Sequence, residues 1–245
     1  MKVGDNMGKI ITIKNNKGGV GKSWITLQLA HLASMLDKTE DEKYKVLILT
    51  SDSQNNILTY TGMDIEVDKG LENLVNKGDK HEIKVRENLF YIPLLSNTFS
   101  NPFREKLKRT LEDLKSEYDV IFIDSVPTLN IDKDFVDAAD HIVIPTFLDT
   151  ATTQGILKLM DEIDTKKIKA IIPNKFTKLK TEMDWYKVLK TQTRGTTINL
   201  THPIRYSSLV NSLIEKGKTI WETRAKGAEE VQLVLYGVVE ELIHE

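Results

Sequence analysis

A run of glycines and lysines near the start of the chain has the composition of a phosphate-binding loop. Residues 15–23 read NNKGGVGKS, which fits the pattern G-x-x-x-x-G-K-[ST] except that Asn16 replaces the first glycine. Glycines without a Cβ let the backbone turn its N–H groups toward phosphate oxygens. Lys22 would reach the β- and γ-phosphates, and the Ser23 hydroxyl would ligate Mg²⁺. A glycine-rich turn with two solvated lysines is the alternative.

The elements around this loop decide whether it can hold a phosphate. A β-branched, apolar run over 9–15 predicts a buried strand before the loop, and apolar residues at helical spacing over 23–36 predict a helix after it. The N-terminus of that helix would add its dipole to an anion site. Strand, glycine-rich loop and helix in this order form the context that a phosphate-binding loop requires.

Short apolar strands alternate with amphipathic helices along the rest of the chain, which predicts parallel β-α-β units. We expect an α/β fold with a single doubly wound, mostly parallel sheet flanked by helices, in one domain over residues 1–245. The helix that begins near residue 101 would have Pro102 in its first turn and Asn101 as its cap. The expected strands are 9–15, 45–50, 88–94, 119–124, 141–145, 169–174 and 196–200. The expected helices are 23–36, 71–75, 101–118, 133–139, 151–162, 181–194, 206–216 and 224–243.

The phosphate loop carries a second lysine, Lys17, five residues before Lys22. The string K-G-G-V-G-K-S resembles the deviant Walker A motif of the ParA/MinD ATPase superfamily. The resemblance implies that ATP binds here and that two ATP-bound subunits form a homodimer, in which Lys17 reaches the partner's nucleotide and adds positive charge at the transition state. A surface lysine beside the loop is the alternative. The implied nucleotide contacts in this segment are Gly18, Gly19, Val20, Gly21, Lys22, Ser23 and Trp24.

A polar cluster follows the expected strand at 45–50 and resembles the family's second motif, D-x-D-P-Q. Asp52 matches the second Asp of that motif and Gln54 its Gln, whereas Thr50 replaces the first Asp and Ser53 the Pro. The resemblance implies that Asp52 orients the attacking water, so Lys17, Lys22 and Asp52 are the implied catalytic residues. A polar turn at the end of a strand is the alternative.

The segment YDVIFIDSVPTLN (118–130) resembles a Walker B region, an apolar strand that ends in an aspartate followed closely by a proline. Asp124 would hold Mg²⁺ together with Ser23, through a water molecule because Mg²⁺ keeps much of its hydration shell. The alternative is an aspartate that caps the following helix.

Two segments of the C-terminal half resemble the family's base-binding parts. Asn174, in IIPNKF (171–176), matches the asparagine that reads adenine, and its amide can donate and accept as the adenine edge requires. A turn-forming asparagine is an equal alternative. The segment 202–222 resembles I-P-R…G-K-x-I with the Pro and Ile exchanged, which places Pro203 and Arg205 beside the base.

The charge of the chain is unevenly distributed. The net charge is −2, yet residues 166–226 contain 14 Lys and Arg against 4 Asp and Glu. Clustered cations suffice to bind the DNA backbone without sequence preference, and ParA-type ATPases bind DNA in this way as ATP dimers. A solvated lysine-rich surface is the alternative. The candidate DNA contacts are Lys187, Lys190, Arg194, Arg205 and Arg224.

Composition excludes several other classes of protein. The chain has 245 residues and no cysteine, which excludes disulfides, thiol nucleophiles and cysteine-ligated clusters. We find no signal-peptide core and no apolar run that could span a bilayer, so we expect a cytoplasmic protein. The DNA binding that the resemblance implies would associate it with the nucleoid. About eight residues precede the first strand, so we expect no N-terminal helix-turn-helix domain. The acidic C-terminal helix predicts no membrane binding of the MinD kind.

The sequence therefore predicts a Mg²⁺-dependent ATPase of the ParA partition type, which would dimerise on ATP, bind DNA and respond to a centromere-binding, ParB-type adaptor. Two other functions stay open. The same ATPase could position a protein cargo without DNA, and a metabolic P-loop enzyme could phosphorylate a small acceptor.

Overall fold

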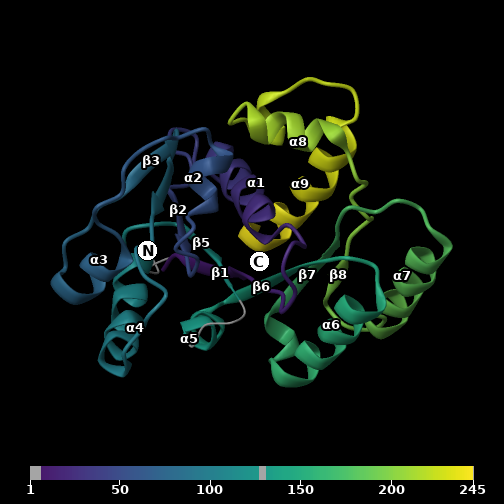
Figure 1. Cartoon of the computed structure of the whole chain (residues 1–245), viewed down its shortest axis with the longest axis horizontal. Helices are drawn as coiled ribbons and strands as arrows, with labels where there is room; N and C mark the ends of the chain where they lie inside the picture. Colours follow the sequence, from purple (N-terminus) through teal and green to yellow (C-terminus); the bar gives the residue numbers. More distant parts are fainter. Residues whose placement is uncertain (1–6, 127–130, 245) are drawn as a thin grey trace.

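The computed structural model describes residues 7–126 and 131–244, and its centre is one eight-stranded sheet (Figure 1). The strand order is β3-β4-β2-β5-β1-β6-β7-β8, and every pairing is parallel except that of β3 with β4. The sequence-based expectation of a doubly wound, mostly parallel sheet is confirmed. The strands are β1 Lys9–Ile13, β2 Val46–Thr50, β3 Ile83–Arg86, β4 Leu89–Ile92, β5 Val120–Asp124, β6 His141–Thr146, β7 Ile168–Pro173 and β8 Asn199–Leu200.

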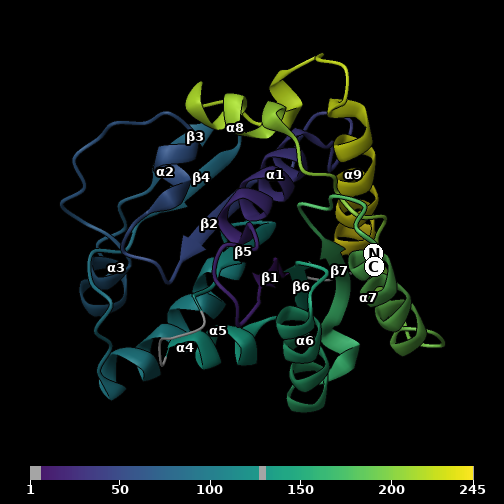
Figure 2. The same cartoon turned by 45° about the vertical axis from the view of Figure 1, so that its right-hand side comes forward.

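Helices cover both faces of the sheet (Figures 1 and 2). One apolar core lies between the sheet and α1, α2, α8 and α9, and a second lies between the opposite face and α3 to α7. The helices are α1 Lys22–Met35, α2 Asn56–Tyr60, α3 Leu71–Lys77, α4 Asn101–Lys115, α5 Ile131–Ala138, α6 Thr150–Glu162, α7 Lys180–Gln192, α8 Ser208–Glu215 and α9 Ala228–His244, with 3₁₀ turns η1 Thr165–Lys167 and η2 Ile220–Glu222.

The alternation of side chains along the central strands divides these two cores. In β5, Val120 and Phe122 face the α1 side, whereas Ile121 and Ile123 face the α4 side. All four are buried, as expected of a parallel strand with helices on both faces. Within residues 7–126 and 131–244, no helix is long and apolar enough to cross a membrane.

Register places the ends of three strands side by side. Asp124, the last residue of β5, pairs with Ile13 at the end of β1 and with Thr50 at the end of β2. The loops that follow these strands therefore emerge at one edge of the sheet. This is the edge at which α/β proteins bind ligands.

Two elements were not predicted from the sequence. β3 is a short edge strand with the sequence IKVR, in which charged residues interrupt the apolar pattern. α2 has five residues and follows Asn55, whose backbone is left-handed with φ 49°, and no side chain caps it. Neither segment is long enough for its periodicity to be recognised.

Several predicted boundaries are wrong, among them the cap of α4, the start of α9 and the extent of β8. The cap of α4 is Ser100, whose hydroxyl accepts a hydrogen bond from the Phe103 N–H, and Asn101 is already helical. α9 begins at Ala228 instead of 224, because Gly227 has a φ of 95°, in the left-handed region. β8 contains only two residues of the expected strand 196–200.

Candidate nucleotide site

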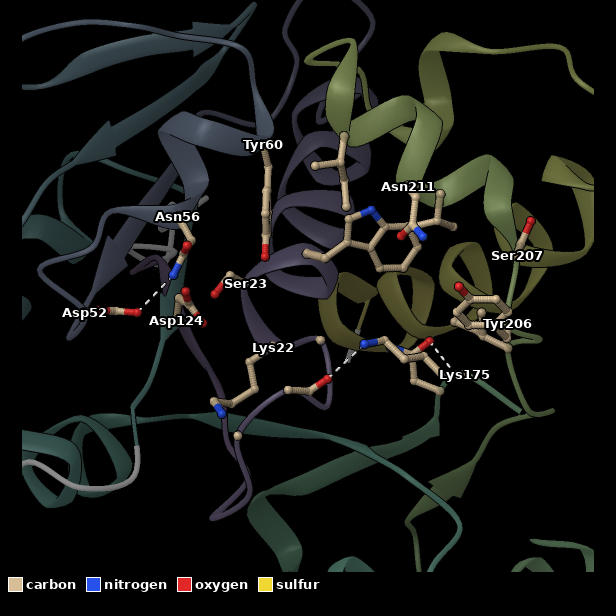
Figure 3. A pocket seen from close by; sticks show the side chains of 18 of the residues that line it. Lys22, Ser23, Asp52, Asn56, Tyr60, Asp124, Lys175, Tyr206, Ser207 and Asn211 are labelled. Atoms are coloured by element: carbon tan, nitrogen blue, oxygen red, sulfur yellow. Dashed lines mark hydrogen bonds between the residues drawn. The ribbon is translucent and has the colours of Figure 1, made fainter. Parts of the chain in front are cut away.

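A cavity of about 570 Å³ opens where the strands end (Figure 3). Its walls come from the loops after β1, β2, β5 and β7, as the sequence predicts, and also from α2 and α8. Lys22, Ser23, Asp52 and Asp124 lie on one side of the view, and Tyr206 on the other. The lining residues are Asn16, Gly18, Gly19, Gly21, Lys22, Ser23, Trp24, Asp52, Asn56, Tyr60, Asp124, Val126, Asn174, Lys175, Ile204, Arg205, Tyr206, Ser207, Val210, Asn211 and Ile214.

Hydrogen bonds of the Asn15 side chain hold the start of the phosphate loop, whereas no side chain caps the helix at its end. Asn15 is buried; its amide donates to the Pro145 carbonyl (2.7 Å) and accepts from the Lys17 N–H (2.8 Å). The loop ends at Gly21, the N-cap of α1, whose φ is 96° and which has no side chain to cap the helix. The first N–H groups of α1 are therefore left for an anion.

Lys22 lines the cavity (Figure 3). Its ammonium donates to the Lys17 carbonyl at 3.2 Å. Burial lowers the pKa of this ammonium, and the nearby carboxylate of Asp124 opposes part of that shift. The groups of the protein therefore do not fully balance the positive charge of this ammonium. Phosphate oxygens at this place would supply the missing negative charge.

Asp124 has the properties of a ligand for a hard cation. It is buried, and its Oδ1 has no hydrogen-bond partner among the described residues. Burial raises its pKa to about 6, although the Ser23 hydroxyl and the Lys22 ammonium both favour the ionised form. A buried carboxylate oxygen without a partner calls for an explanation, and Mg²⁺, which prefers oxygen ligands, would satisfy it. Ser23 and Asp124 lie side by side (Figure 3) and fit the predicted metal site.

Asp52 lies at the edge of the cavity in a locally bonded turn. Its two carboxylate oxygens accept hydrogen bonds from the Gln54 N–H and from the side-chain amide of Asn56, each at 3.0 Å (Figure 3). Thr50 stands where the resembled motif has its first Asp, and its hydroxyl accepts from the Asp52 N–H at 3.0 Å. Thr50 therefore fixes the turn that carries Asp52 instead of adding a carboxylate.

Two residues that follow β7 donate hydrogen bonds to carbonyls of the phosphate loop. The amide of Asn174 donates to the Val20 carbonyl at 2.9 Å, and its oxygen accepts from the Lys175 N–H. The Lys175 ammonium donates to the Gly19 carbonyl at 3.2 Å. Val20 is itself buried and does not line the cavity. Asn174 thus lies at the predicted place, with one amide hydrogen engaged by the loop.

Sequence reasoning missed the wall formed by α2 and α8. Tyr60 of α2 directs its hydroxyl toward Ser23, and Asn211 of α8 faces it across the cavity (Figure 3). Trp24, from the first turn of α1, is buried and lines the same region. Of the two base contacts predicted in the segment 202–222, Arg205 lines the cavity and pairs with Glu230 at 3.3 Å, whereas Pro203 does not line it. Sequence periodicity does not reveal this wall, because α2 is too short for its pattern to be recognised.

Comparison with known proteins shows the family to which this chain belongs. A family model described as an AAA domain matches residues 8–177. The chain is 32% identical to the sporulation initiation inhibitor protein Soj of Bacillus subtilis, over 64% of this chain and 65% of Soj. It is 28% identical to the chromosome partitioning protein ParA of Myxococcus xanthus, over 66% of this chain and 60% of ParA. Each match therefore spans less than two thirds of the relative.

Among solved structures, the chain resembles the ATP complex of a single-substitution variant of McdA from Cyanothece, with a TM-score of 0.78, 21% identity and coverage of 96% of both chains. The chain belongs to the ParA/MinD-type P-loop ATPases. The residues that the family model matches include the glycine-rich segment.

Lys17, the second lysine of the ParA/MinD-type loop, is exposed and is not among the residues that line the cavity. Its backbone is held by Asn15, so the side chain leaves the loop from a fixed point. This placement leaves Lys17 free to act outside its own cavity. Its proposed role in a partner's site stays a prediction.

The candidate DNA contacts do not form one cluster. Lys187 and Lys190 lie on α7 and Arg194 follows its end, all three exposed, and Lys187 pairs with Asp184 at 3.0 Å. The segment between η2 and α9, which carries Arg224, lies away from α7 in both views (Figures 1 and 2). Arg205 is at the cavity. The α7 group is therefore the coherent candidate surface.

The glycines of the loop offer a matched pair for testing its geometry. A Cβ at Gly21 would lie 2.5 Å from the Asn174 amide nitrogen and would strain a φ of 96°, whereas a Cβ at Gly18 would meet nothing within 4 Å. We expect Gly21→Ala to lower the free energy of unfolding by about 1–3 kcal/mol and to abolish measurable ADP binding. Gly18→Ala should leave stability within about 0.5 kcal/mol. Urea unfolding and calorimetric ADP titration measure both; equal effects of the two substitutions would contradict the assigned geometry.

The pKa of Asp124 predicts a pH-dependent stability. Because its folded pKa of about 6 lies above its ordinary value of 3.8, the contribution of this group to stability is full below about pH 4 and is lost as the pH rises through 6. At pH 8 without Mg²⁺ or nucleotide, we therefore expect Asp124→Asn to be more stable than the unmodified chain, by up to about 3 kcal/mol. Urea unfolding at pH 5 and pH 8 measures the difference.

The exposed carboxylate of Asp64 provides the control, since Asp64→Asn should not change the pH dependence. Added Mg²⁺ should stabilise the unmodified chain and leave Asp124→Asn unaffected. A variant less stable than the unmodified chain at pH 8 would show that Asp124 is not an uncompensated buried charge.

Proposed function

We propose that this chain hydrolyses ATP in an ATP-dependent homodimer that binds DNA without sequence preference and segregates plasmid or chromosomal DNA. One observation carries the proposal. The deviant Walker A loop directs Lys22 into a cavity beside Asp124, whose buried oxygen has no partner among the described residues, while Lys17 stands outside that cavity. The loop therefore carries two lysines with different positions. Lys22 is placed to bind the nucleotide of its own chain, and Lys17 is available to the nucleotide of another copy.

Each residue of the cavity has a role in this proposal. The α1 N-terminus and Lys22 bind the phosphates, and Ser23 and Asp124 hold Mg²⁺, which would neutralise phosphate charge. Asp52, beside Asn56 on the cavity edge, orients the attacking water. Asn174, Arg205 and the 204–207 loop surround the base. Lys17 completes the partner's site and makes hydrolysis depend on pairing.

The DNA-binding part of the proposal rests on charge. Residues 166–226 have a net charge of +10, from 14 cations and 4 anions, and the α7 group of Lys187, Lys190 and Arg194 is exposed. The name of the relative ParA, a chromosome partitioning protein, favours the same role. In such a role, a centromere-binding, ParB-type adaptor would stimulate hydrolysis and release DNA. The dimer would then be cytoplasmic and associated with the nucleoid.

A second candidate function is the positioning of a protein cargo without DNA. It is favoured by the ion pairs of the candidate DNA contacts: Lys187 with Asp184, and Arg205 with Glu230. A cation that is paired within the chain offers less to a phosphate backbone than a free one. The DNA experiment below separates the two functions.

Hydrolysis and pairing can be separated by substitution. We expect Asp52→Ala to bind ATP and Mg²⁺ but to lower the turnover rate at least about 100-fold, so that a stable dimer accumulates. Lys22→Ala should bind no nucleotide and remain monomeric, and Lys17→Ala should bind ATP without hydrolysing it. Sedimentation velocity with ATP, ADP or neither, combined with phosphate release, measures these states. Normal turnover of Asp52→Ala would remove Asp52 from its role.

DNA binding should require ATP and decrease steeply with salt. We expect Lys187→Ala, Lys190→Ala and Arg194→Ala each to lower the slope of log affinity against log salt by about 0.9, since each phosphate contact releases counterions. Arg109→Ala, an exposed arginine on α4, is the matched control and should leave the slope unchanged. Fluorescence anisotropy on a duplex of arbitrary sequence measures the slope. No ATP-dependent binding at low salt would favour the cargo positioner.

A further inference from the structure

A third lysine lies behind the phosphate loop, and neither the loop motif nor the proposed mechanism uses it. Lys14 follows β1 directly, and its backbone N–H continues the sheet by donating to the Val143 carbonyl at 2.9 Å. Its side chain is buried and forms an ion pair with Asp132, in the first turn of α5. Both residues are nearly inaccessible, at 5% and 7% exposure. An ion pair is therefore enclosed in the protein, one residue before the segment that forms the phosphate loop.

The pair connects β1, β5 and α5, and the nucleotide site depends on the relative positions of these elements. Asp132 also accepts a hydrogen bond from the hydroxyl of Ser125, which is buried and directly follows Asp124. Lys14 is three residues before Lys17, at the root of the phosphate loop. A single carboxylate on α5 thus contacts both the strand that leads into the loop and the strand that ends in the proposed Mg²⁺ ligand.

Stability alone gives no reason for this arrangement. Burying two charges costs desolvation, and a buried ion pair replaced by apolar residues of similar size is often neutral or stabilising. The surrounding core could accommodate such a replacement, because β1 and α5 also contribute Ile10, Ile131 and Phe135 to it. The position of the pair, behind the loop, suggests a role in the electrostatics of the site.

The two charges act on the phosphate site with opposite signs. At Lys22, Lys14 lowers the pKa of the ammonium and Asp132 raises it, so both lie within electrostatic reach of the group that would bind the phosphates. Their effects on this ammonium oppose each other. If Lys14 is removed, the Asp132 carboxylate near the anion site loses its cation and keeps only the Ser125 hydroxyl. If Asp132 is removed, a cation without its carboxylate is left there.

We propose that Lys14 and Asp132 are positioning residues of the nucleotide site: a charge-balanced pair that holds the root of the phosphate loop against the Asp124 strand and sets the electrostatic potential felt by the phosphates. This rests on the proposed function, in that the ligand is a nucleotide. The two residues of the pair are 118 positions apart along the chain, and the short loop motif does not include them.

The test uses the opposite signs, which a merely structural role would not produce. ADP is titrated calorimetrically into the full-length chain at pH 8 with Mg²⁺, because ADP avoids hydrolysis. We expect Lys14→Met to weaken ADP binding about tenfold, and Asp132→Asn to leave it unchanged or to strengthen it up to about tenfold. The double variant Lys14→Met/Asp132→Asn removes both charges and keeps an acceptor for Ser125. Its affinity should return to within about threefold of the unmodified chain.

The control is Lys133→Met, which removes a positive charge from the same helix at an exposed position and should not change ADP affinity. Each variant is titrated at a temperature at which circular dichroism shows it to be folded. If both single variants weaken binding by similar factors, or if neither changes it, the inference is wrong while the proposed function stands. An unmodified chain that binds no ADP would overturn both.

Discussion

The candidate site depends on the parallel pairing of β5 with β1 on one side and β2 on the other. Because Asp124 is in register with both Ile13 and Thr50, the three strands end at the same level. The segments that follow must then leave the sheet together, and they carry the phosphate loop, Asp52 and Asp124. A shift of one residue in either pairing would turn the Asp124 side chain to the opposite face.

The residues brought together in this way are electrostatically incomplete. Asp124 is buried with a raised pKa, about 6, and Lys22 is partly buried with a lowered one, so each is held in surroundings that disfavour its charge. Two groups of opposite sign that both resist ionisation favour the binding of a cation with an anion, which is the character of a magnesium nucleotide. Holding both charges in such surroundings lowers the stability of the fold. A cavity that bound no ligand could instead be filled by well-packed side chains without this loss. The perturbed pKa values are therefore consistent with a binding site.

The sequence predicted the parts of the site that follow from local pattern. The strand before residue 15 and the glycines were found from apolar pattern and the phosphate-loop motif. Asp52 and Asp124 were found because their segments resemble the family's motifs. The wall with Tyr60 and Asn211 was not found, since α2 has five residues and no side-chain cap. The hydrogen bond from Asn174 to Val20 joins residues 154 positions apart, and the ion pair of Lys14 with Asp132 joins residues 118 positions apart. Single-sequence periodicity contains no information on such partners, because each side chain alone is compatible with an exposed position.

Thr50 shows how a departure from a motif can be accommodated by the geometry around it. An aspartate at this position would stand beside Asp124 in the sheet, and two neighbouring carboxylates raise each other's pKa. Burial already raises the pKa of Asp124, so a second carboxylate would oppose its ionisation further. Threonine avoids that repulsion and still accepts a hydrogen bond from the Asp52 N–H. The orientation of Asp52 therefore depends on an oxygen acceptor at position 50 and not on a negative charge there, which is why a hydrolytic role for Asp52 is compatible with this substitution.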